Sequence, residues 1–341
     1  PTWNHRLGIT DLESPTWNHR LGITDLESPT WNHRLGITDM TQSHQGTVVF
    51  GIPRSGSTLL RQLLDAHPNI SCVGNTGLFS ACGRFLRREH VDSGEADGFM
   101  DRLESAGVDS LETVSQLRRF VFKVFDDIAM QRGALQWVSQ TADDIFNLEE
   151  IEQLCGNSCR FITVHRHGAD VACSLMDLNN EHGTFLPEVH RYICQYPMPL
   201  IAMANLWIDY ARRLRAFELR HAHNVLVVNY DELVTQTEEV MSRILEFLGE
   251  SAEGWSIEEA MYDTASAPMH DWASGCWGID TTSVRRWQRL KPALIQRLAQ
   301  VLNPTLEECG YDTISHMEAQ PVARLPIAAI PLTAYDARSN H

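Results

Sequence analysis

Residues 47–64 read Thr-Val-Val-Phe-Gly-Ile-Pro-Arg-Ser-Gly-Ser-Thr-Leu-Leu-Arg-Gln-Leu-Leu, and the architecture of the chain follows from them. The apolar run at 47–50 is typical of a buried parallel strand. Gly51 and Gly56 bracket a tight loop, and the leucines of 58–64 continue as the first turns of a helix. A strand, a glycine loop and a helix in this order form a unit whose loop N–H groups can hold a phosphate at the helix N-terminus.

Strands and helices continue to alternate along the rest of the chain. Further strands are predicted at 69–73, 160–164 and 224–228, and helices within 78–135 and at 169–178 and 240–248. Such alternation predicts an α/β fold of the P-loop-like type, a single domain with a mainly parallel sheet flanked by helices.

The first 39 residues do not belong to this pattern. The unit PTWNHRLGITDLES stands at 1–14 and 15–28, and again at 29–39 without its last three residues. Identity letter for letter is not what natural divergence leaves, so 1–39 is interpreted as a tandem tag and Met40 as the native start. The remaining 302 residues suffice for one large domain, predicted at 40–316. The proline-containing tail at 317–341 is predicted to be an extended arm.

Composition limits the partners of the chain. The net charge is −16, and the repeat accounts for −2 of it, which leaves −14. Such a surplus of acid repels polyanions, so no nucleic acid or membrane is expected as a partner, and an anionic cofactor must be held by local basic groups and backbone amides. No apolar run reaches the length of a membrane span and no leader follows Met40, so a cytoplasmic location is expected. The oligomeric state is left open.

Eight cysteines are scattered without a CxxC pair. Cys155 and Cys159 have a spacing that zinc sites use, but no second pair of ligands accompanies them. Free, buried or partly buried thiols and no metal site are expected.

The loop departs from the P-loop of kinases and ATPases at one position. Gly51-x-x-x-x-Gly56-Ser57-Thr58 has Ser57 where those enzymes have Lys, and its cation is Arg54 instead. This difference argues against a kinase or NTPase with a degenerate loop, which stays the alternative enzyme class.

The run Pro-Arg-Ser-Gly-Ser-Thr-Leu-Leu-Arg at 53–61, continued by Leu-Asp-Ala-His-Pro at 64–68, resembles the sulfotransferase superfamily, most closely its tyrosylprotein-type and bacterial members. The resemblance covers roughly 46–316. It implies a sulfotransferase that moves the sulfuryl group of 3′-phosphoadenosine-5′-phosphosulfate (PAPS) to an oxygen or nitrogen of a small molecule or natural product, without a metal. Arg54 would then clamp the oxygen between phosphate and sulfate.

The same resemblance implies the other nucleotide-binding residues. Arg166, after the strand at 160–164, and Ser174, eight residues on in the following helix, fit the pair that binds the 3′-phosphate. Tyr230 would lie near the ribose or that phosphate, and Arg286 in the place of the family's phosphate-binding Lys or Arg. The complete implied set is Arg54, Ser55, Gly56, Ser57, Thr58, Arg166, Ser174, Tyr230, Ser274, Arg286 and Trp287.

The match fails where the acceptor should be deprotonated. Tyrosylprotein-type relatives have a Glu-Glu-Thr-Arg run there, whereas residues 73–77 read Val-Gly-Asn-Thr-Gly. Asn75 can orient an acceptor but cannot accept its proton. Three explanations are open: a base from the stretch with Glu181, His182 and His190, a nitrogen acceptor, or loss of catalysis, which would leave a nucleotide-binding protein. Sulfation of protein tyrosine is not expected.

Three tryptophans, Trp207, Trp272 and Trp277, suggest an aromatic acceptor pocket. Core packing is the more common role of tryptophan.

Overall fold

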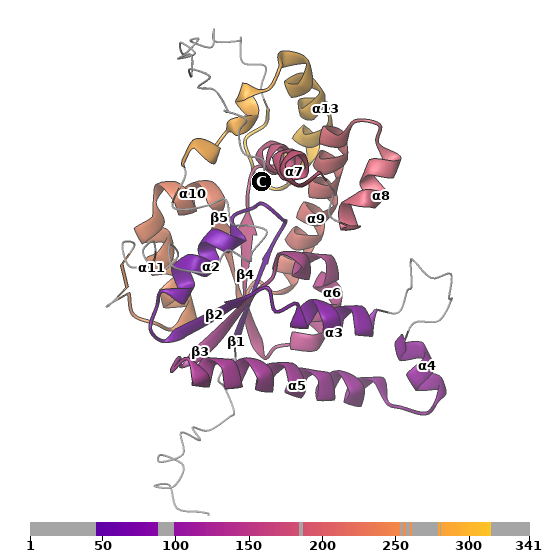
Figure 1. The fold of residues 1–341 in the computed structure, drawn as a ribbon, viewed down its shortest axis with the longest axis vertical. Coiled ribbons are helices and arrows are strands. Elements are labelled where there is room, and N and C mark those ends of the chain that lie inside the picture. Colours follow the sequence, from indigo (N-terminus) through magenta and orange to yellow (C-terminus); the bar gives the residue numbers. More distant parts are fainter. Residues whose placement is uncertain are drawn as a thin grey trace, which may run out of the picture. The chain divides into compact units, whose positions relative to one another are not determined.

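The sheet at the centre of the fold has the strand order β2-β3-β1-β4-β5, and every neighbouring pair of strands is parallel (Figure 1). The structure of the chain is a computed structural model, which describes residues 46–87, 99–183, 187–252, 255–256, 260, 279 and 281–314. The strands are β1 (Gly46–Gly51), β2 (Ile70–Gly74), β3 (Gln136–Gln140), β4 (Cys159–His165) and β5 (Val225–Asn229). The predicted α/β fold with a parallel sheet is confirmed. The tag assigned to 1–39 and the arm assigned to 317–341 lie outside the described residues.

Helices connect the strands and cover both faces of the sheet. They are α2 (Ser57–Asp65), α3 (Leu78–Leu86), α4 (Phe99–Ser105), α5 (Ser110–Gln131), α6 (Leu148–Cys155), α7 (Gly168–His182), α8 (Pro187–Gln195), α9 (Pro199–Arg220), α10 (Tyr230–Thr235), α11 (Thr237–Leu248) and α13 (Pro292–Glu308). Short 3₁₀ helices are η1 (Ala142–Asn147), η2 (Thr281–Ser283) and η3 (Arg286–Arg289).

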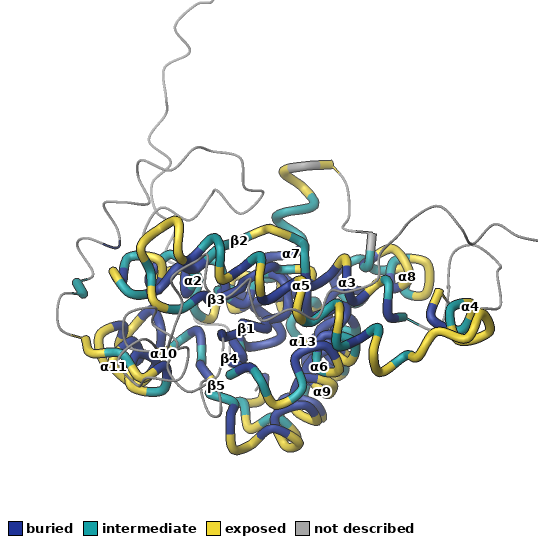
Figure 2. The backbone as a smooth tube through the Cα atoms, turned by 90° about the horizontal axis from the view of Figure 1, so that it is seen from below, coloured by how far each residue is buried: buried dark blue, intermediate teal, exposed yellow. Residues whose placement is uncertain are grey.

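The central strand β1 is buried on both faces, as Figure 2 shows for the middle of the sheet. Successive side chains of a strand point to opposite faces, so Val48 and Phe50 enter one core and Val49 the other. The first core packs against α3, α5, α6, α7, α9 and α13. The second packs against α2, α10 and α11. Because both faces of β1 are buried, the run at 47–50 does not alternate between apolar and polar residues.

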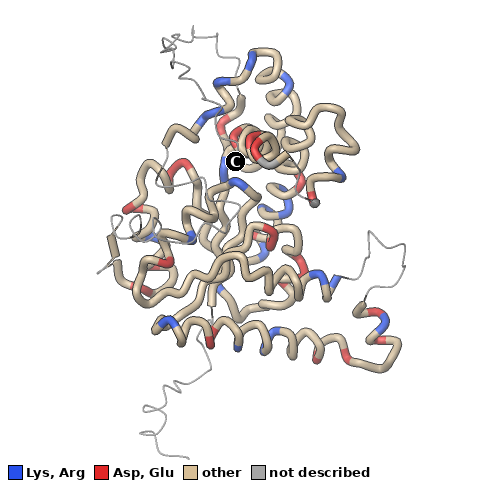
Figure 3. The backbone as a smooth tube through the Cα atoms, viewed as in Figure 1, with Lys and Arg blue, Asp and Glu red and all other residues tan. Residues whose placement is uncertain are grey.

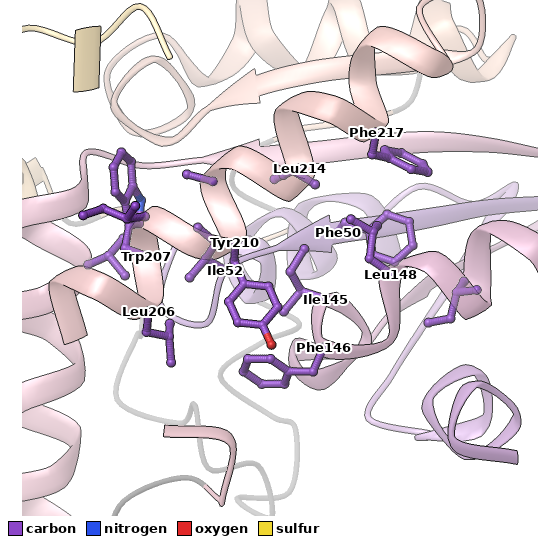
Figure 4. Packing of buried hydrophobic residues seen from close by; sticks show 14 of the residues in the cluster. Phe50, Ile52, Ile145, Phe146, Leu148, Leu206, Trp207, Tyr210, Leu214 and Phe217 are labelled. Carbon is purple, nitrogen blue, oxygen red and sulfur yellow. The ribbon is translucent and has the colours of Figure 1, made fainter. Parts of the chain in front are cut away.

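Aromatic side chains fill the space between the sheet and α9 (Figure 4). Phe217 of α9 packs edge-on against Phe50 and Phe161, with ring centroids 5.4 Å and 4.9 Å apart. Because these rings lie beneath β1 and β4, they fix the two strands whose carboxyl ends lead into the loops described below.

The sequence Asp65-Ala66-His67-Pro68 ties α2 to the start of β2. Asp65 Oδ1 accepts the backbone N–H of Cys72 at 2.8 Å and Nη1 of Arg132 at 2.9 Å. His67 accepts the N–H of Asn69 on Nδ1 at 3.2 Å, and its Nε2 lies 3.0 Å from the carbonyl of Ser251. These side chains are structural, and they hold the strand from which the Asn75 turn continues.

The connections reverse direction beside β1. The chain leaves β1 through α2 toward β2 on one side, whereas it leaves β4 toward β5 on the other. In open parallel sheets, ligands bind in the crevice outside the carboxyl ends of the strands at such a point. Here that point lies between the loop after β1 and the residues after β4.

Candidate active site

The loop between β1 and α2 has a strained backbone. Arg54 has a φ of 75° and Gly56 a φ of 98°, both in the left-handed region. The N–H of Ser55 closes the turn on the carbonyl of Ile52 at 2.9 Å. A non-glycine residue with positive φ is uncommon and persists only where its surroundings hold it.

Arg166 is the residue that holds Arg54. It directly follows β4, is only 5% exposed, and donates from Nη1 to the carbonyl of Arg54 at 2.8 Å. Its Nη2 donates to the carbonyl of Ser283 at 2.8 Å. Burial lowers the pKa of Arg166, but a guanidinium keeps its charge at neutral pH. Both of these acceptors are neutral carbonyl oxygens, and the carboxylates of Asp170 and Asp231 act on the guanidinium through space.

Tyr230 packs between Arg166 and the loop. The guanidinium carbon of Arg166 lies 4.2 Å from the centroid of the Tyr230 ring, a cation–π contact. On the loop side, a Cβ at position 56 would lie 2.2 Å from Cδ2 of Tyr230, and only glycine leaves room for this approach. Tyr230, the first residue of α10, therefore packs against both the loop and Arg166.

Ser174 meets the side chain of Arg54. It lies in the second turn of α7, is 2% exposed, and its Oγ accepts from Nε of Arg54 at 3.0 Å. The two motifs, more than a hundred residues apart, are therefore joined twice: Arg166 binds the backbone of Arg54, and Arg54 binds the side chain of Ser174.

The other loop residues shape the start of α2. Ser57 Oγ accepts from Nε2 of Gln140, the last residue of β3, at 3.0 Å. Ser55 is 1% exposed and its hydroxyl has no hydrogen-bond partner among the described residues. Thr58 is half-buried. Gly56, the N-cap of α2, has no side chain to bond the first N–H groups, and an uncapped helix N-terminus attracts an anion.

The basic segment near the C-terminus, Ser283 to Trp287, lies against α7. Arg286 pairs with Asp177, one turn beyond Ser174. Trp287 is 7% exposed and stacks on His167, with ring centroids 5.9 Å apart and an interplanar angle of 17°. Arg286 and Trp287 are thereby placed at the helix that carries Ser174.

The sequence pattern that defines the sulfotransferase family matches residues 47–254, which include the loop, Arg166, Ser174 and Tyr230. The chain belongs to the sulfotransferase family. It is an enzyme of the transferase class, and membership implies PAPS as the co-substrate.

Individual sulfotransferases are distantly similar to this one. The chain is 25% identical to protein-tyrosine sulfotransferase 1 of Danio rerio over 279 residues, which are 77% of this chain and 71% of that protein. It is 27% identical to protein-tyrosine sulfotransferase 2 of Gallus gallus over 210 residues, 60% of this chain and half of that protein.

Two solved structures share the fold. The sulfotransferase domain of the Synechococcus PCC 7002 olefin synthase superposes with a TM-score of 0.50 at 18% identity, covering 81% of this chain and 98% of that one. The sulfotransferase domain from the curacin biosynthetic pathway superposes with a TM-score of 0.52 at 18% identity, covering 80% of this chain and all of the other.

Asn75 of this sulfotransferase lies at the end of β2, on the same edge of the sheet as the loop. It is exposed, has a φ of 52°, and its N–H donates to the carbonyl of Gln140 at 3.2 Å. Glu181 and His190 are exposed on the last turn of α7 and on α8, and the side chain of His182 lies outside the described part. No contact described in the structure brings Glu181 or His190 to Arg54.

Trp207 belongs to the core of the sulfotransferase and does not line an acceptor pocket. It is 1% exposed and donates from Nε1 to the carbonyl of Arg166 at 3.1 Å. Figure 4 shows it among the apolar side chains of α9. A Cβ at Gly168 would lie 2.6 Å from its ring, so Trp207 also fixes the entry into α7.

Other sequence expectations concern the stretch 272–277 and a metal site. Ser274, Trp272 and Trp277 lie outside the described residues. Among the described residues, no three His, Cys, Asp or Glu side chains are grouped so that they could hold a metal, and Cys155 and Cys159 are buried free thiols. Within the same part of the chain, we find no helix with the length and apolar character needed to cross a membrane.

Two residues of the site have no counterpart in the sequence predictions. Gln140 ends β3, a strand that the sequence pattern does not predict, and reaches Ser57. Asp170 binds the segment Ser283 to Trp287 from 115 residues away. An acidic residue in the first turn of a predicted helix is the only local signal for Asp170, and it indicates helix stabilisation alone.

Proposed function

We propose that this sulfotransferase moves the sulfuryl group of PAPS to an oxygen or nitrogen nucleophile of a small molecule, with the loop, Arg166 and Ser174 as the donor site. The observation that carries the proposal is the double contact between the motifs. Arg166 Nη1 lies 2.8 Å from the Arg54 carbonyl, and Arg54 Nε lies 3.0 Å from Ser174 Oγ. The groups expected to bind both phosphates of one nucleotide are therefore in direct contact with each other.

The charges and polar atoms of this group of residues suit a polyanion. The guanidinium of Arg166 bonds the backbone carbonyl of Arg54, and the guanidinium of Arg54 bonds Ser174, so both motifs contribute a cation to the donor site. The buried hydroxyl of Ser55 and Nε of Arg166 have no hydrogen-bond partners among the described residues. Buried polar groups are normally paired, so such atoms point to a polar ligand.

Arg54 supplies the electrostatic part of the chemistry. In sulfuryl transfer, the bond between sulfur and the bridging phosphate oxygen breaks while sulfur bonds to the acceptor, and negative charge grows on the departing oxygen. A guanidinium inside the phosphate loop is placed to stabilise that oxygen, and the N–H groups at the start of α2 hold the 5′-phosphate. In a kinase loop, a Lys and a magnesium ion stabilise the negative charge that develops on the phosphate oxygens.

The acceptor is proposed to be a small molecule because of the residue at the end of β2. Asn75 is exposed after the carboxyl end of β2 and can orient an acceptor through its amide, but it offers no carboxylate for proton transfer. The named relatives are protein-tyrosine sulfotransferases. The Glu-Glu-Thr-Arg run expected of that type is absent at residues 73–77 of this chain.

A ligand-induced shift of the melting temperature tests the donor site. We expect 3′,5′-adenosine bisphosphate to stabilise the protein by about 2.7 kcal/mol at a hundredfold excess over its Kd, which raises Tm by several degrees. ATP with magnesium serves as the comparison for a kinase. Stabilisation by ATP with magnesium alone contradicts the proposal.

A screen with labelled PAPS tests the acceptor class. Phenols, alcohols, amines and a tyrosine-containing peptide are compared at equal concentration. We expect transfer to at least one small molecule at a higher rate than to the peptide. Transfer to the peptide alone would overturn the small-molecule assignment but keep the donor site, whereas no transfer with intact bisphosphate binding would indicate a nucleotide-binding protein.

A further inference from the structure

Asp170 is a fully buried carboxylate that makes no contact with the loop. It lies in the first turn of α7, four residues after Arg166, and is 0% exposed. Its Oδ2 accepts the backbone N–H of Arg285 at 2.8 Å, and its Oδ1 accepts the backbone N–H of Trp287 at 3.0 Å. Both oxygens are thus used to hold one distant segment of the chain.

The backbone of that segment is shaped to receive an anion. Arg285 has a φ of 54°, in the left-handed region, and the 3₁₀ helix η3 begins at the next residue. Successive residues of left- and right-handed conformation turn their N–H groups toward a common point and form a concave anion site. Asp170 occupies this site, and the helix N-terminus of α7 further stabilises its negative charge.

The segment also contacts the residues that follow β4 through side chains. Arg166 Nη2 donates to the carbonyl of Ser283, Arg286 pairs with Asp177, and Trp287 stacks on His167. The side chain of Arg285 extends outward, 64% exposed, toward Asp312. The segment therefore rests on the same short stretch that carries Arg166 and Ser174, and Asp170 accepts two of its backbone N–H groups.

Resting on the proposed function, we infer that Asp170 is a positioning residue for the 3′-phosphate. The two hydrogen bonds of Asp170 to the backbone of the segment Ser283 to Trp287, called the clasp, hold this segment on α7. Arg286 and the backbone next to Arg166 are thereby kept close to Arg166 and Ser174, which are proposed to bind the 3′-phosphate. Loss of this clasp should weaken recognition of the 3′-phosphate and leave the 5′-phosphate loop intact. Asp170 thereby contributes to selection of a 3′-phosphorylated nucleotide without touching it.

The test compares two nucleotides that differ only in the 3′-phosphate. The Kd of 3′,5′-adenosine bisphosphate and of adenosine 5′-monophosphate is measured by calorimetry for the full chain and for Asp170→Asn. Asn keeps the volume and one acceptor oxygen but turns an NH₂ group toward a backbone N–H. We expect the bisphosphate to bind about tenfold or more weakly, and the monophosphate to change by less than about threefold.

A control separates this effect from the general effect of replacing a buried carboxyl group by an amide. Asp144→Asn replaces another carboxyl group with 0% exposure, which bonds Ser80 and is not among the described partners of the segment. We expect it to leave the ratio of the two dissociation constants unchanged. An equal loss of both nucleotides in Asp170→Asn, or an unchanged ratio, overturns the inference. If the unaltered chain does not bind the bisphosphate, the proposed function itself fails, and the clasp with it.

Hydrogen exchange of the unaltered protein gives a second test that needs no variant. The amides of Arg285 and Trp287 are expected to be protected without nucleotide, and more protected with the bisphosphate than with the monophosphate. Exchange of both amides at the rate of unprotected peptide would overturn the inference.

Discussion

Arg54 combines two structural tasks within one residue. Its backbone carbonyl, brought into reach of Arg166 by a positive φ, joins the loop to β4, while its guanidinium points to Ser174. The backbone contact is independent of the side chain. A substitution at Arg54 can therefore remove the guanidinium and keep the contact that orders the loop.

Arg54→Ala is expected to reduce turnover far more than nucleotide binding. Removing one preorganised donor from a developing negative charge lowers kcat by about 10²- to 10³-fold in other enzymes. The Kd of 3′,5′-adenosine bisphosphate should rise by less than about tenfold, because the loop N–H groups and Arg166 remain. Single-turnover assays and calorimetry measure the two quantities. Arg119→Ala, on the exposed face of α5, is the control. Retained turnover in Arg54→Ala would show that the leaving oxygen is stabilised elsewhere.

Gly56→Ala tests the contact between the loop and Tyr230. The new Cβ would lie 2.2 Å from the ring at a φ of 98°. We expect a loss of stability of about 2–4 kcal/mol and weaker nucleotide binding, because the ring that supports Arg166 must shift.

Gly133→Ala is the matched control for Gly56→Ala. Its φ is 73°, but no described atom lies within 4 Å of the added Cβ. This variant should lose only about 1 kcal/mol, since it has the backbone strain without the clash. Equal losses in the two melting curves would contradict a specific role of Tyr230.

At the scale of elements, the sequence predicts those strands that contain a local run of apolar residues. The strands predicted at 47–50, 69–73, 160–164 and 224–228 agree with β1, β2, β4 and β5 within one residue at each end. Strand β3 is not predicted because its side chains are largely polar, although Ser139 and Gln140 are buried and Gln140 bonds Ser57. Polar residues inside a sheet are stabilised by partners that are distant in the sequence.

The site follows the same rule. The loop and the pair Arg166 and Ser174 are local motifs, so the sequence can propose them, and the structure brings them into contact. The clasp of Asp170 is not identified, because its bonds to Arg285 and Trp287 join residues 115 and 117 positions apart.

The junction of η1 and α3 should make stability depend on pH. Asp144 in η1 accepts the hydroxyl of Ser80 in α3 at 2.7 Å, and burial raises the pKa of Asp144 to about 7. The folded chain keeps this proton up to about pH 7, whereas an unfolded aspartate loses it near pH 3.9. Its stabilising contribution is therefore complete below about pH 4 and is lost as the pH rises through about 7.

Asp144→Asn imitates the protonated carboxyl and still offers an oxygen to Ser80. The melting temperature of the variant, relative to the unaltered protein, should rise between pH 5 and pH 8, by at most the equivalent of about 2.7 kcal/mol. A constant difference across this range in calorimetric scans would contradict a raised pKa at Asp144.

At the scale of the whole molecule, the site is a local exception to the charge. The chain has a net charge of −16, and Figure 3 shows basic and acidic segments interspersed over the described elements. An anionic nucleotide is therefore attracted by the few guanidiniums at the carboxyl ends of β1 and β4, since the molecule as a whole repels it. The positions of those guanidiniums depend on packing by helices that lie far apart in the sequence, such as α2 and α13.

The domain predicted at 40–316 can be tested by truncation. Helix α13 places Leu298, Leu302 and Leu306 in the core with 0% exposure, and Tyr311 packs against Trp207, whose indole bonds the carbonyl of Arg166. Each buried leucine contributes about 1.5–3 kcal/mol, whereas a domain is stable by only about 5–15 kcal/mol. A chain of residues 40–290 should therefore lose its cooperative unfolding transition and its affinity for 3′,5′-adenosine bisphosphate. A chain of residues 40–316 should melt within about 4 °C of the full chain, a difference of about 1 kcal/mol or less, and bind the bisphosphate equally well. If the 40–316 chain fails to fold or to bind while the full chain does both, residues outside this range belong to the domain.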